Sequence, residues 1–240
     1  MSSPTRQARL RWPIRCLAVD FGGTLARPGP QVSGAVVAGV LRDRFQMDPP
    51  PHFAQVFDQQ LRDRAGSSAL TDVVAAAYEI CQPIPVPPDH VIEAVFEILP
   101  DAAVDPRCGQ ALRRITTLGV RCVLACDTQR TLRARQRTLE AAGIAELFDG
   151  LVLSSDVGVR KPHPDFYARV LAEACCPPDQ VLFAGDTPAK DVLAPLRYGM
   201  QAVLVSPAGD AAGSGVPAEV TVIADFTALP DLLAEAADGS

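Results

Sequence analysis

From Pro106 to the C-terminus, short apolar runs alternate with segments of helical periodicity. The apolar runs are rich in Val and Leu and are bounded by Gly or polar residues, which predicts buried strands. Strands that alternate with helices through short connections favour an open parallel sheet with helices on both faces. The expected strands are residues 14–20, 120–126, 150–155, 180–186, 201–206 and 220–225.

Residues 27–102 interrupt this alternation. Stretches with apolar residues at helical spacing follow one another, separated by Pro-rich segments at 49–51 and 83–88, and none is typical of a strand. We therefore predict an α/β fold with two parts. A Rossmann-like, three-layer core would comprise residues 12–26 and 103–240, and an all-helical domain, residues 27–102, would be inserted into it.

Composition restricts the class of function. The net charge is −6 and no basic tract is present, so we expect no nucleic-acid partner. No apolar run approaches the roughly 20 residues of a membrane span, so we expect no membrane partner. The seven cysteines contain no CxxC pair and no N-terminal signal pattern is present, which favours reduced thiols in the cytoplasm. Only two lysines occur, Lys161 and Lys190.

Polar residues stand at the ends of three expected strands: Asp20, Asp127 and Asp186. Ligands bind beyond the carboxyl ends of parallel strands, so we expect these groups to converge there, with Asp191 close by. Clustered carboxylates repel one another unless a cation lies among them, and an oxygen-only site suits Mg²⁺ better than Zn²⁺. A site with Mg²⁺, a lysine and helix N-termini attracts phosphoryl groups, and a carboxylate beside phosphorus can form an aspartyl-phosphate.

Four motifs, in this order, resemble those of the haloacid dehalogenase-like superfamily, and specifically its phosphatase branch. The similarity spans about residues 14–26 and 103–230. The resemblance implies that the helical domain, residues 27–102, is a cap that closes over the site and selects the substrate. The motifs are DFGGT (20–24), VLACDT (123–128), VRKPHPDFY (159–167) and FAGDTPAKD (183–191).

The resemblance also implies a role for each matching residue. Asp20 would be the nucleophile, and Lys161 would contact both Asp20 and the phosphoryl oxygens, offsetting the charge of the transition state. Thr24 would support the nucleophile loop. The expected substrate is a small phosphorylated metabolite, and the oligomeric state is not indicated. The protein ligands of Mg²⁺ would be Asp20, the backbone carbonyl of Gly22, Asp186 and Asp191.

Gly22 departs from the phosphatase pattern, which has an aspartate there as general acid and base. Loss of this aspartate typically lowers the reaction rate by a factor of ~10²–10⁴, and the effect is greatest when the leaving group is an alkoxide. Four interpretations stay open: a replacement acid, restriction to good leaving groups such as acyl phosphates, different chemistry in secondary metabolism, or a catalytically weak phospho-ligand-binding or regulatory protein. The candidate replacement acids are Asp127, His52, Asp58, Glu79, His90 and the substrate itself.

Two other activities of the superfamily fit the residues less well. Phosphonoacetaldehyde hydrolases need a lysine in the cap, and residues 27–102 contain none. The 2-haloacid dehalogenases need no metal, so Asp186 and Asp191 favour the metal-dependent branch.

The second motif departs as well, because Cys126 and Asp127 stand where the family usually has Ser or Thr followed by Asn. A thiol is a weak hydrogen-bond donor, so Cys126 would hold a phosphoryl oxygen less well than a hydroxyl. No histidine is placed by the sequence to activate it as a nucleophile. Two roles stay open for Asp127: the N-cap of the next helix, or a protonated donor whose acidic neighbours raise its pKa.

Overall fold

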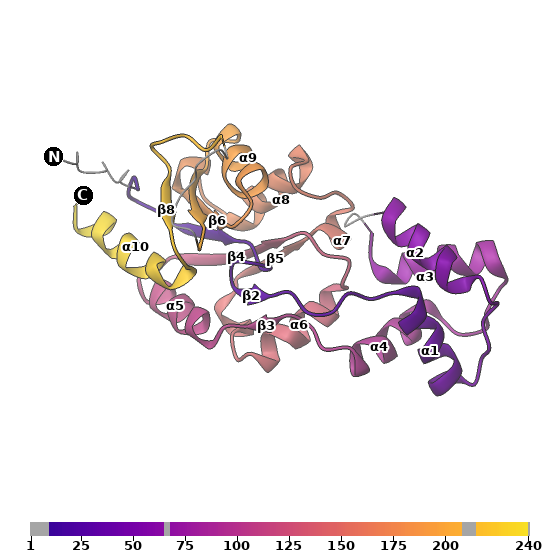
Figure 1. Cartoon of the computed structure of the whole chain (residues 1–240). Helices are drawn as coiled ribbons and strands as arrows, with labels where there is room; N and C mark the ends of the chain where they lie inside the picture. The colour runs from indigo at the N-terminus through magenta and orange to yellow at the C-terminus, as the bar shows by residue number, and fades with distance from the viewer. Residues whose placement is uncertain (1–9, 65–67, 208–214, 240) are drawn as a thin grey trace.

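The computed structural model of the chain (Figure 1) describes residues 10–64, 68–207 and 215–239. Within these residues, six parallel strands form one sheet, and the first strand of the chain is central in it. The parallel α/β sheet predicted from the alternation is confirmed. In sheet order the strands are β5 (Gly150–Leu153), β4 (Arg121–Cys126), β1 (Cys16–Val19), β6 (Val181–Gly185), β7 (Gln201–Val205) and β8 (Thr221–Ile223).

Helices cover both faces of this sheet and give the α/β part three layers (Figure 1). Successive side chains of β1 alternate between two hydrophobic clusters, as the twofold period of a strand requires. One cluster includes residues of α5 (Pro106–Thr117) and α10 (Leu229–Asp238), and the other includes residues of α8 (Pro164–Ala174). The remaining helices of this part are α6 (Leu132–Ala141), α7 (Ser154–Val157) and α9 (Ala194–Arg197).

Two segments differ from the predicted elements. Ser154 and Ser155 begin α7, although the sequence predicts that they continue the strand. Pro188–Leu193 forms a π-helical turn ahead of α9, although the pattern of residues 189–199 predicts one continuous α-helix. The backbone N–H of Asp191 donates to Thr187 O, and the Asp191 carboxylate accepts from Thr187 N, so this turn is tied back to the end of β6. Such π-helical turns are frequent at functional sites.

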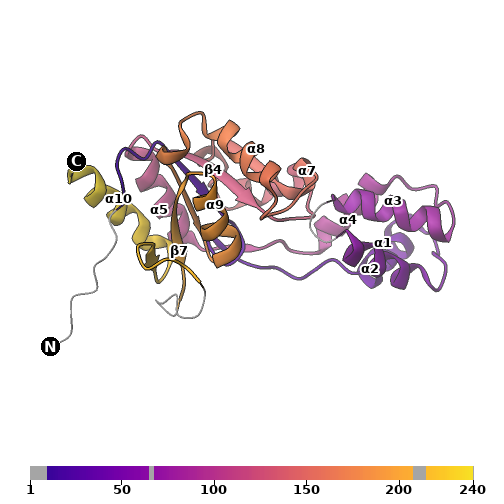
Figure 2. The same cartoon turned by 90° about the horizontal axis from the view of Figure 1, so that it is seen from above.

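Four helices form a group beside the α/β part (Figures 1 and 2). Their apolar faces make a hydrophobic cluster of their own, in which the rings of Phe53, Phe57 and Tyr78 pack together. The helices predicted between residues 31 and 100 are therefore confirmed. They are α1 (Gly34–Phe45), α2 (Phe53–Asp63), α3 (Leu70–Cys81) and α4 (Pro88–Ile98).

The chain enters and leaves this helical group through a two-stranded antiparallel ladder that the sequence pattern does not reveal. Its strands are β2 (Ala26–Arg27) and β3 (Ala103–Val104), with Arg27 opposite Ala103. The domain borders predicted after residues 26 and 102 lie at this ladder. The function of the four helices as a cap stays a prediction.

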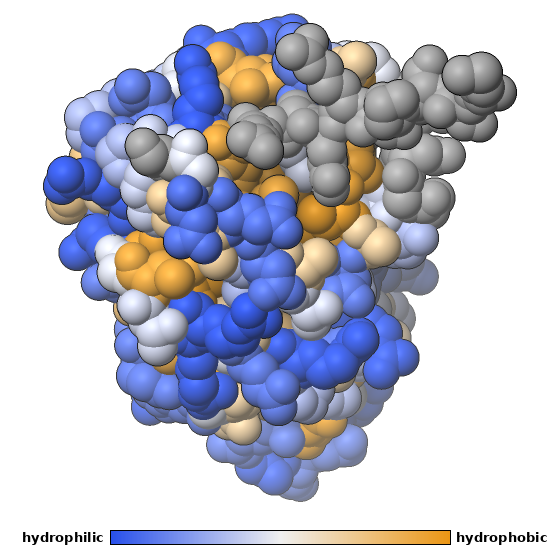
Figure 3. Space-filling model, turned by 90° about the vertical axis from the view of Figure 1, so that its left-hand side faces the viewer, coloured by the Kyte–Doolittle hydropathy of each residue, from blue (hydrophilic) through white to orange (hydrophobic). Residues whose placement is uncertain are grey.

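The end of the α/β part that lies away from the four helices is largely hydrophilic, with separate hydrophobic areas (Figure 3). In the portions of the chain that the structure describes, no helix combines the length and the apolar character that crossing a bilayer requires.

Candidate active site

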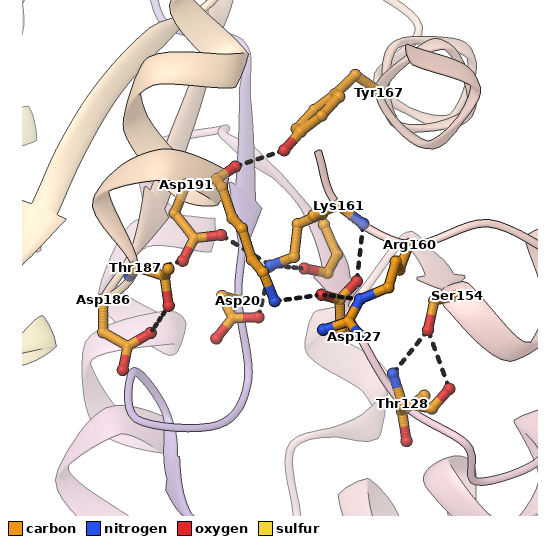
Figure 4. Close-up of polar contacts among 12 residues, drawn as sticks. Asp20, Asp127, Thr128, Ser154, Arg160, Lys161, Tyr167, Asp186, Thr187 and Asp191 are labelled. Carbon is orange, nitrogen blue, oxygen red and sulfur yellow. Dashed lines mark hydrogen bonds and ion pairs between the residues drawn. The ribbon is translucent and has the colours of Figure 1, made fainter. Parts of the chain in front are cut away.

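The carboxylates of Asp20, Asp186 and Asp191 meet at one edge of the sheet (Figure 4). Val19 pairs with Leu124 of β4 and with Ala184 of β6, so the residues after these strands emerge side by side. One oxygen of each carboxylate lies within 4.8 Å of one oxygen of the other two. Asp20 and Asp191 are buried, and Asp186 is partly exposed.

Lys161 lies between two of these carboxylates, and its side chain is only 2% exposed. Its Nζ donates to Oδ1 of Asp20 and to Oδ1 of Asp191, both at 2.7 Å, and to the carbonyl oxygen of Ala125 at 3.1 Å. Burial alone would lower the pKa of Lys161, but the charges of Asp20 and Asp191 outweigh it and raise that pKa above its ordinary value. Lys161 is therefore a permanent cation at this site.

The carboxylates remain in excess over the one ammonium group. Burial raises the pKa of Asp20 to about 6; Lys161 offsets part of this shift, and the charges of Asp191 and Asp186 add to it. Burial and the charge of Asp191 also raise the pKa of Asp186. A divalent cation would relieve this repulsion, and oxygen donors at an open edge fit Mg²⁺. The geometry thus brings together three of the four predicted metal ligands.

Backbone hydrogen bonds hold the loop that follows Asp20. The N–H groups of Leu25 and Ala26 both donate to Phe21 O at 2.9 Å, and Gly23 N donates to Ala26 O. The Thr24 hydroxyl is buried and has no hydrogen-bond partner among the residues that the structure describes. Thr24 therefore lies in the loop that follows Asp20, but within the described residues its hydroxyl makes no hydrogen bond that would support this loop.

Gly22, the fourth predicted metal ligand, is exposed at the same loop. A Cβ atom built on it meets no atom within 4 Å, so the position has room for a side chain. It also lines a cavity of about 550 Å³. A carbonyl ligand at this position stays a prediction.

Cys126 is buried at the end of β4, and burial raises the pKa of its thiol to about 11. The group is thus a neutral thiol at ordinary pH, which argues against a nucleophilic role.

Asp127 does not cap the next helix, and that alternative is wrong. Thr131 precedes α6 and caps it, since its hydroxyl accepts from Ala134 N at 3.3 Å. Asp127 instead accepts from Lys161 N at 2.9 Å and from Lys190 Nζ at 2.8 Å. Arg160 lies nearby, with Nε 3.7 Å from Oδ2 of Asp127. These contacts position the loop that carries Lys161.

The cavity beside Gly22 lies between the α/β part and the helical group. Cys126 and Asp127 line it on one side, and Val32 and Leu61 on the other. Within the described part of the chain, none of the other candidate replacement acids lines it; these are His52, Asp58, Glu79 and His90. One of them has a structural contact instead, because Oδ1 of Asp58 accepts from Gly34 N at 2.7 Å, at the start of α1.

The sequence analysis does not predict several residues of the site. Thr187 donates its hydroxyl to Asp186 and its N–H to Asp191, and its place directly after Asp186 is the signal that could reveal it. Ser154 follows β5 and exchanges hydrogen bonds with the backbone of Thr128, so the strand-end rule could reveal it too. No local pattern marks three further residues, Asp101, Arg130 and Arg135, which meet only in the fold.

The chain belongs to the haloacid dehalogenase-like hydrolases, because the model of that family matches residues 14–199. One curated relative is the haloacid dehalogenase-like hydrolase domain-containing protein 3 of Xenopus laevis, 30% identical over 105 residues. Another is the glyceraldehyde 3-phosphate phosphatase of Methanothermobacter thermautotrophicus, 33% identical over 95 residues. These alignments cover 44% and 38% of this chain, and the chain spans only 42% of the length of each relative.

Solved structures of the same family share the fold. A 2-haloacid dehalogenase from Pseudomonas syringae superposes with a TM-score of 0.71 at 20% identity, over 93% of this chain and 99% of that one. A phosphatase of the family from Thermococcus onnurineus gives a TM-score of 0.56 at 16% identity, over 91% of this chain and 97% of that one. At these identities the similarity establishes the fold and leaves the reaction open.

Proposed function

We propose that the chain is a magnesium-dependent hydrolase of a small phosphorylated metabolite and that Asp20 is its nucleophile. The observation that carries this proposal is the convergence of the Asp20, Asp186 and Asp191 carboxylates around the buried ammonium of Lys161. Free cysteines at all seven positions fit a reducing compartment such as the cytoplasm.

In this proposal Asp20 attacks phosphorus through Oδ2, since Lys161 already binds Oδ1. The bond between phosphorus and the leaving oxygen breaks, and an aspartyl-phosphate forms. Water then attacks this phosphorus, which releases inorganic phosphate and restores Asp20. Lys161 would balance the charge of the phosphoryl oxygens during both steps. Magnesium bound by Asp20, Asp186, Asp191 and the Gly22 carbonyl would neutralise further negative charge.

The leaving oxygen receives no proton from residue 22, because Gly22 has no side chain. Asp127 lines the cavity, but it is held by Lys161 N and Lys190 Nζ, and this pairing disfavours it as the acid. We therefore propose that compounds with good leaving groups, such as acyl phosphates, react fastest.

Turnover of acetyl phosphate and ethyl phosphate, with and without Mg²⁺, tests this function. We expect magnesium-dependent release of phosphate, faster for acetyl phosphate, and a fall to the background rate in Asp20→Asn. Asp231→Asn is a matched control, because Asp231 is exposed on α10 and pairs with Arg114. Equal rates in the wild type and in Asp20→Asn would refute the proposal.

A further inference from the structure

The cavity beside Gly22 has a wall with excess positive charge. Four arginines line it, against two carboxylates, Asp101 and Asp127. The arginines are Arg62, Arg130, Arg135 and Arg160.

Two guanidinium groups in this wall share one carboxylate. Oδ1 of Asp101 accepts from Arg130 Nε at 2.8 Å, and Oδ2 accepts from Arg135 NH1 at 3.2 Å. The Thr138 hydroxyl also donates to Oδ2. Arg135 is only 5% exposed, so it is a buried cation that Asp101 neutralises only in part.

Arg135 is held in one orientation. Its guanidinium stacks on the ring of Phe21 at 3.9 Å, and NH2 donates to the Thr128 hydroxyl at 3.4 Å. Phe21 stands between Asp20 and Gly22, so the charge of Arg135 lies against the loop that follows Asp20. A rigid guanidinium in this place binds an oxyanion at little cost in side-chain entropy.

Two buried donors in the wall have no acceptor. Arg135 Nε and Gln129 Nε2 are shielded from solvent and make no hydrogen bond to any residue in the ranges that the structure covers. Both residues line the cavity. Buried donors normally have a partner, and an oxyanion in the cavity would supply one for each.

We propose that this wall binds a second oxyanion of the substrate, through Arg135, Gln129 and Arg130. The inference rests on the proposed function, since it places the leaving group in the cavity beside Gly22. The substrate is then a phosphorylated compound whose leaving group carries a carboxylate or a further phosphate. Binding energy from this remote group helps to hold phosphorus against Asp20.

Non-hydrolysable phosphonates test the wall without any turnover. Calorimetry in Mg²⁺ compares propylphosphonate, with a neutral tail, against phosphonopropionate and ethylene diphosphonate, whose tails are a carboxylate and a phosphonate. We expect one or both anionic compounds to bind at least about tenfold tighter than propylphosphonate, as charge-assisted hydrogen bonds would give. The tighter of the two identifies the oxyanion. Equal affinity for all three compounds would overturn the inference.

Two variants locate the effect. Arg135→Lys keeps the charge but removes Nε, and Gln129→Leu removes one donor at similar volume; each should reduce the preference for the anionic tail at least about threefold. Arg133→Lys is the control, because Arg133 lies on the same helix, is exposed and pairs with Glu93. Thermal unfolding checks that each variant folds. An unchanged preference in folded Gln129→Leu and Arg135→Lys would refute the assignment.

Hydrolysis of ethyl phosphate and phosphoglycolate gives the second readout, and we expect a higher kcat/KM for phosphoglycolate. The two proposals fail separately. Tail-selective binding of phosphonates without turnover of any phosphate ester would refute the hydrolase and retain the oxyanion wall. Turnover with no dependence on the tail would refute the wall and retain the hydrolase.

Discussion

Gly23 lies so close to Asp186 that a Cβ atom built on the glycine would stand 2.0 Å from Oδ2 of the carboxylate. Gly23 also has φ of +83°, a conformation that favours glycine. The neighbouring Gly22 differs on both counts, since its Cβ would meet open space and its φ lies outside the left-handed region. The first glycine of the pair is replaceable and the second is not.

Gly22→Asp should therefore fold and should restore a proton donor beside the leaving group. We expect magnesium-dependent hydrolysis of ethyl phosphate to rise roughly 10²–10⁴-fold, with a smaller gain for acetyl phosphate. Steady-state release of phosphate measures it. Gly22→Asn is the matched control, because it adds the same volume without an acid. Similar rates in both variants would show that the proton donor is not what the site lacks.

Lys161→Met should destabilise the metal-free protein by about 3–5 kcal/mol at neutral pH, because it leaves buried carboxylates without their cation. Lys190→Met is the natural control in a chain with two lysines. Its Nζ is partly exposed and pairs with Asp127, so we expect a loss of about 1 kcal/mol. Urea unfolding monitored by circular dichroism measures both. Equal losses in the two variants would contradict the electrostatic account of Lys161.

Magnesium affinity should decrease as the pH is lowered, because burial raises the pKa of Asp20 to about 6 while Lys161 only partly offsets this shift. Protonated Asp20 is a poor ligand, so we expect binding to weaken about tenfold between pH 7 and pH 5. Titration calorimetry at several pH values measures it. A constant affinity over this range would show that Asp20 does not share the ion.

The same shift sets how the stability of the metal-free protein depends on pH. Folded Asp20 holds a proton between about pH 4 and pH 6 that the unfolded chain releases. The contribution of Asp20 to the free energy of unfolding should therefore decrease as pH rises through this window. Urea unfolding in chelator, compared with Asp20→Asn, isolates that contribution. A difference between the two proteins that stays constant from pH 4 to pH 6 would contradict it.

Asp101→Asn should destabilise the fold by about 3 kcal/mol, because Asp101 balances two arginines of which Arg135 is buried. Glu97→Gln tests an exposed pair with Arg44 in the same region and should change stability by less than about 0.5 kcal/mol. Chemical denaturation measures both variants. A similar effect of the two substitutions would mean that the Asp101 cluster is no more than a surface ion pair.

The strands and the acidic cluster can be predicted from the sequence because both follow from short sequence patterns. Apolar runs mark β1, β4 and β6, and the carboxyl ends of parallel strands bring Asp20 and Asp186 together whatever the details of packing. Thr131 is missed as the cap of α6, although a threonine just before a helical run is a recognised start signal.

The residues that form the cavity wall cannot be predicted from such short sequence patterns. Asp101 and Arg135 are 34 residues apart in the sequence. The residues around Arg135 in the sequence predict only that it is a polar residue of a helix, α6. Its burial depends on Phe21 and on the course of the chain after α4. Only the three-dimensional arrangement shows which guanidinium groups line the cavity and which face solvent.

The ladder of β2 and β3 also bears on how such a protein diversifies. Arg27 and Ala103 are paired directly across this ladder, so the chain leaves the sheet-bearing part and rejoins it at adjacent points. An insertion of any size attached at these two points leaves the threading of the strands unchanged. The inserted helices can therefore be exchanged as a unit, while the sheet and the acidic cluster at the ends of its strands stay in place.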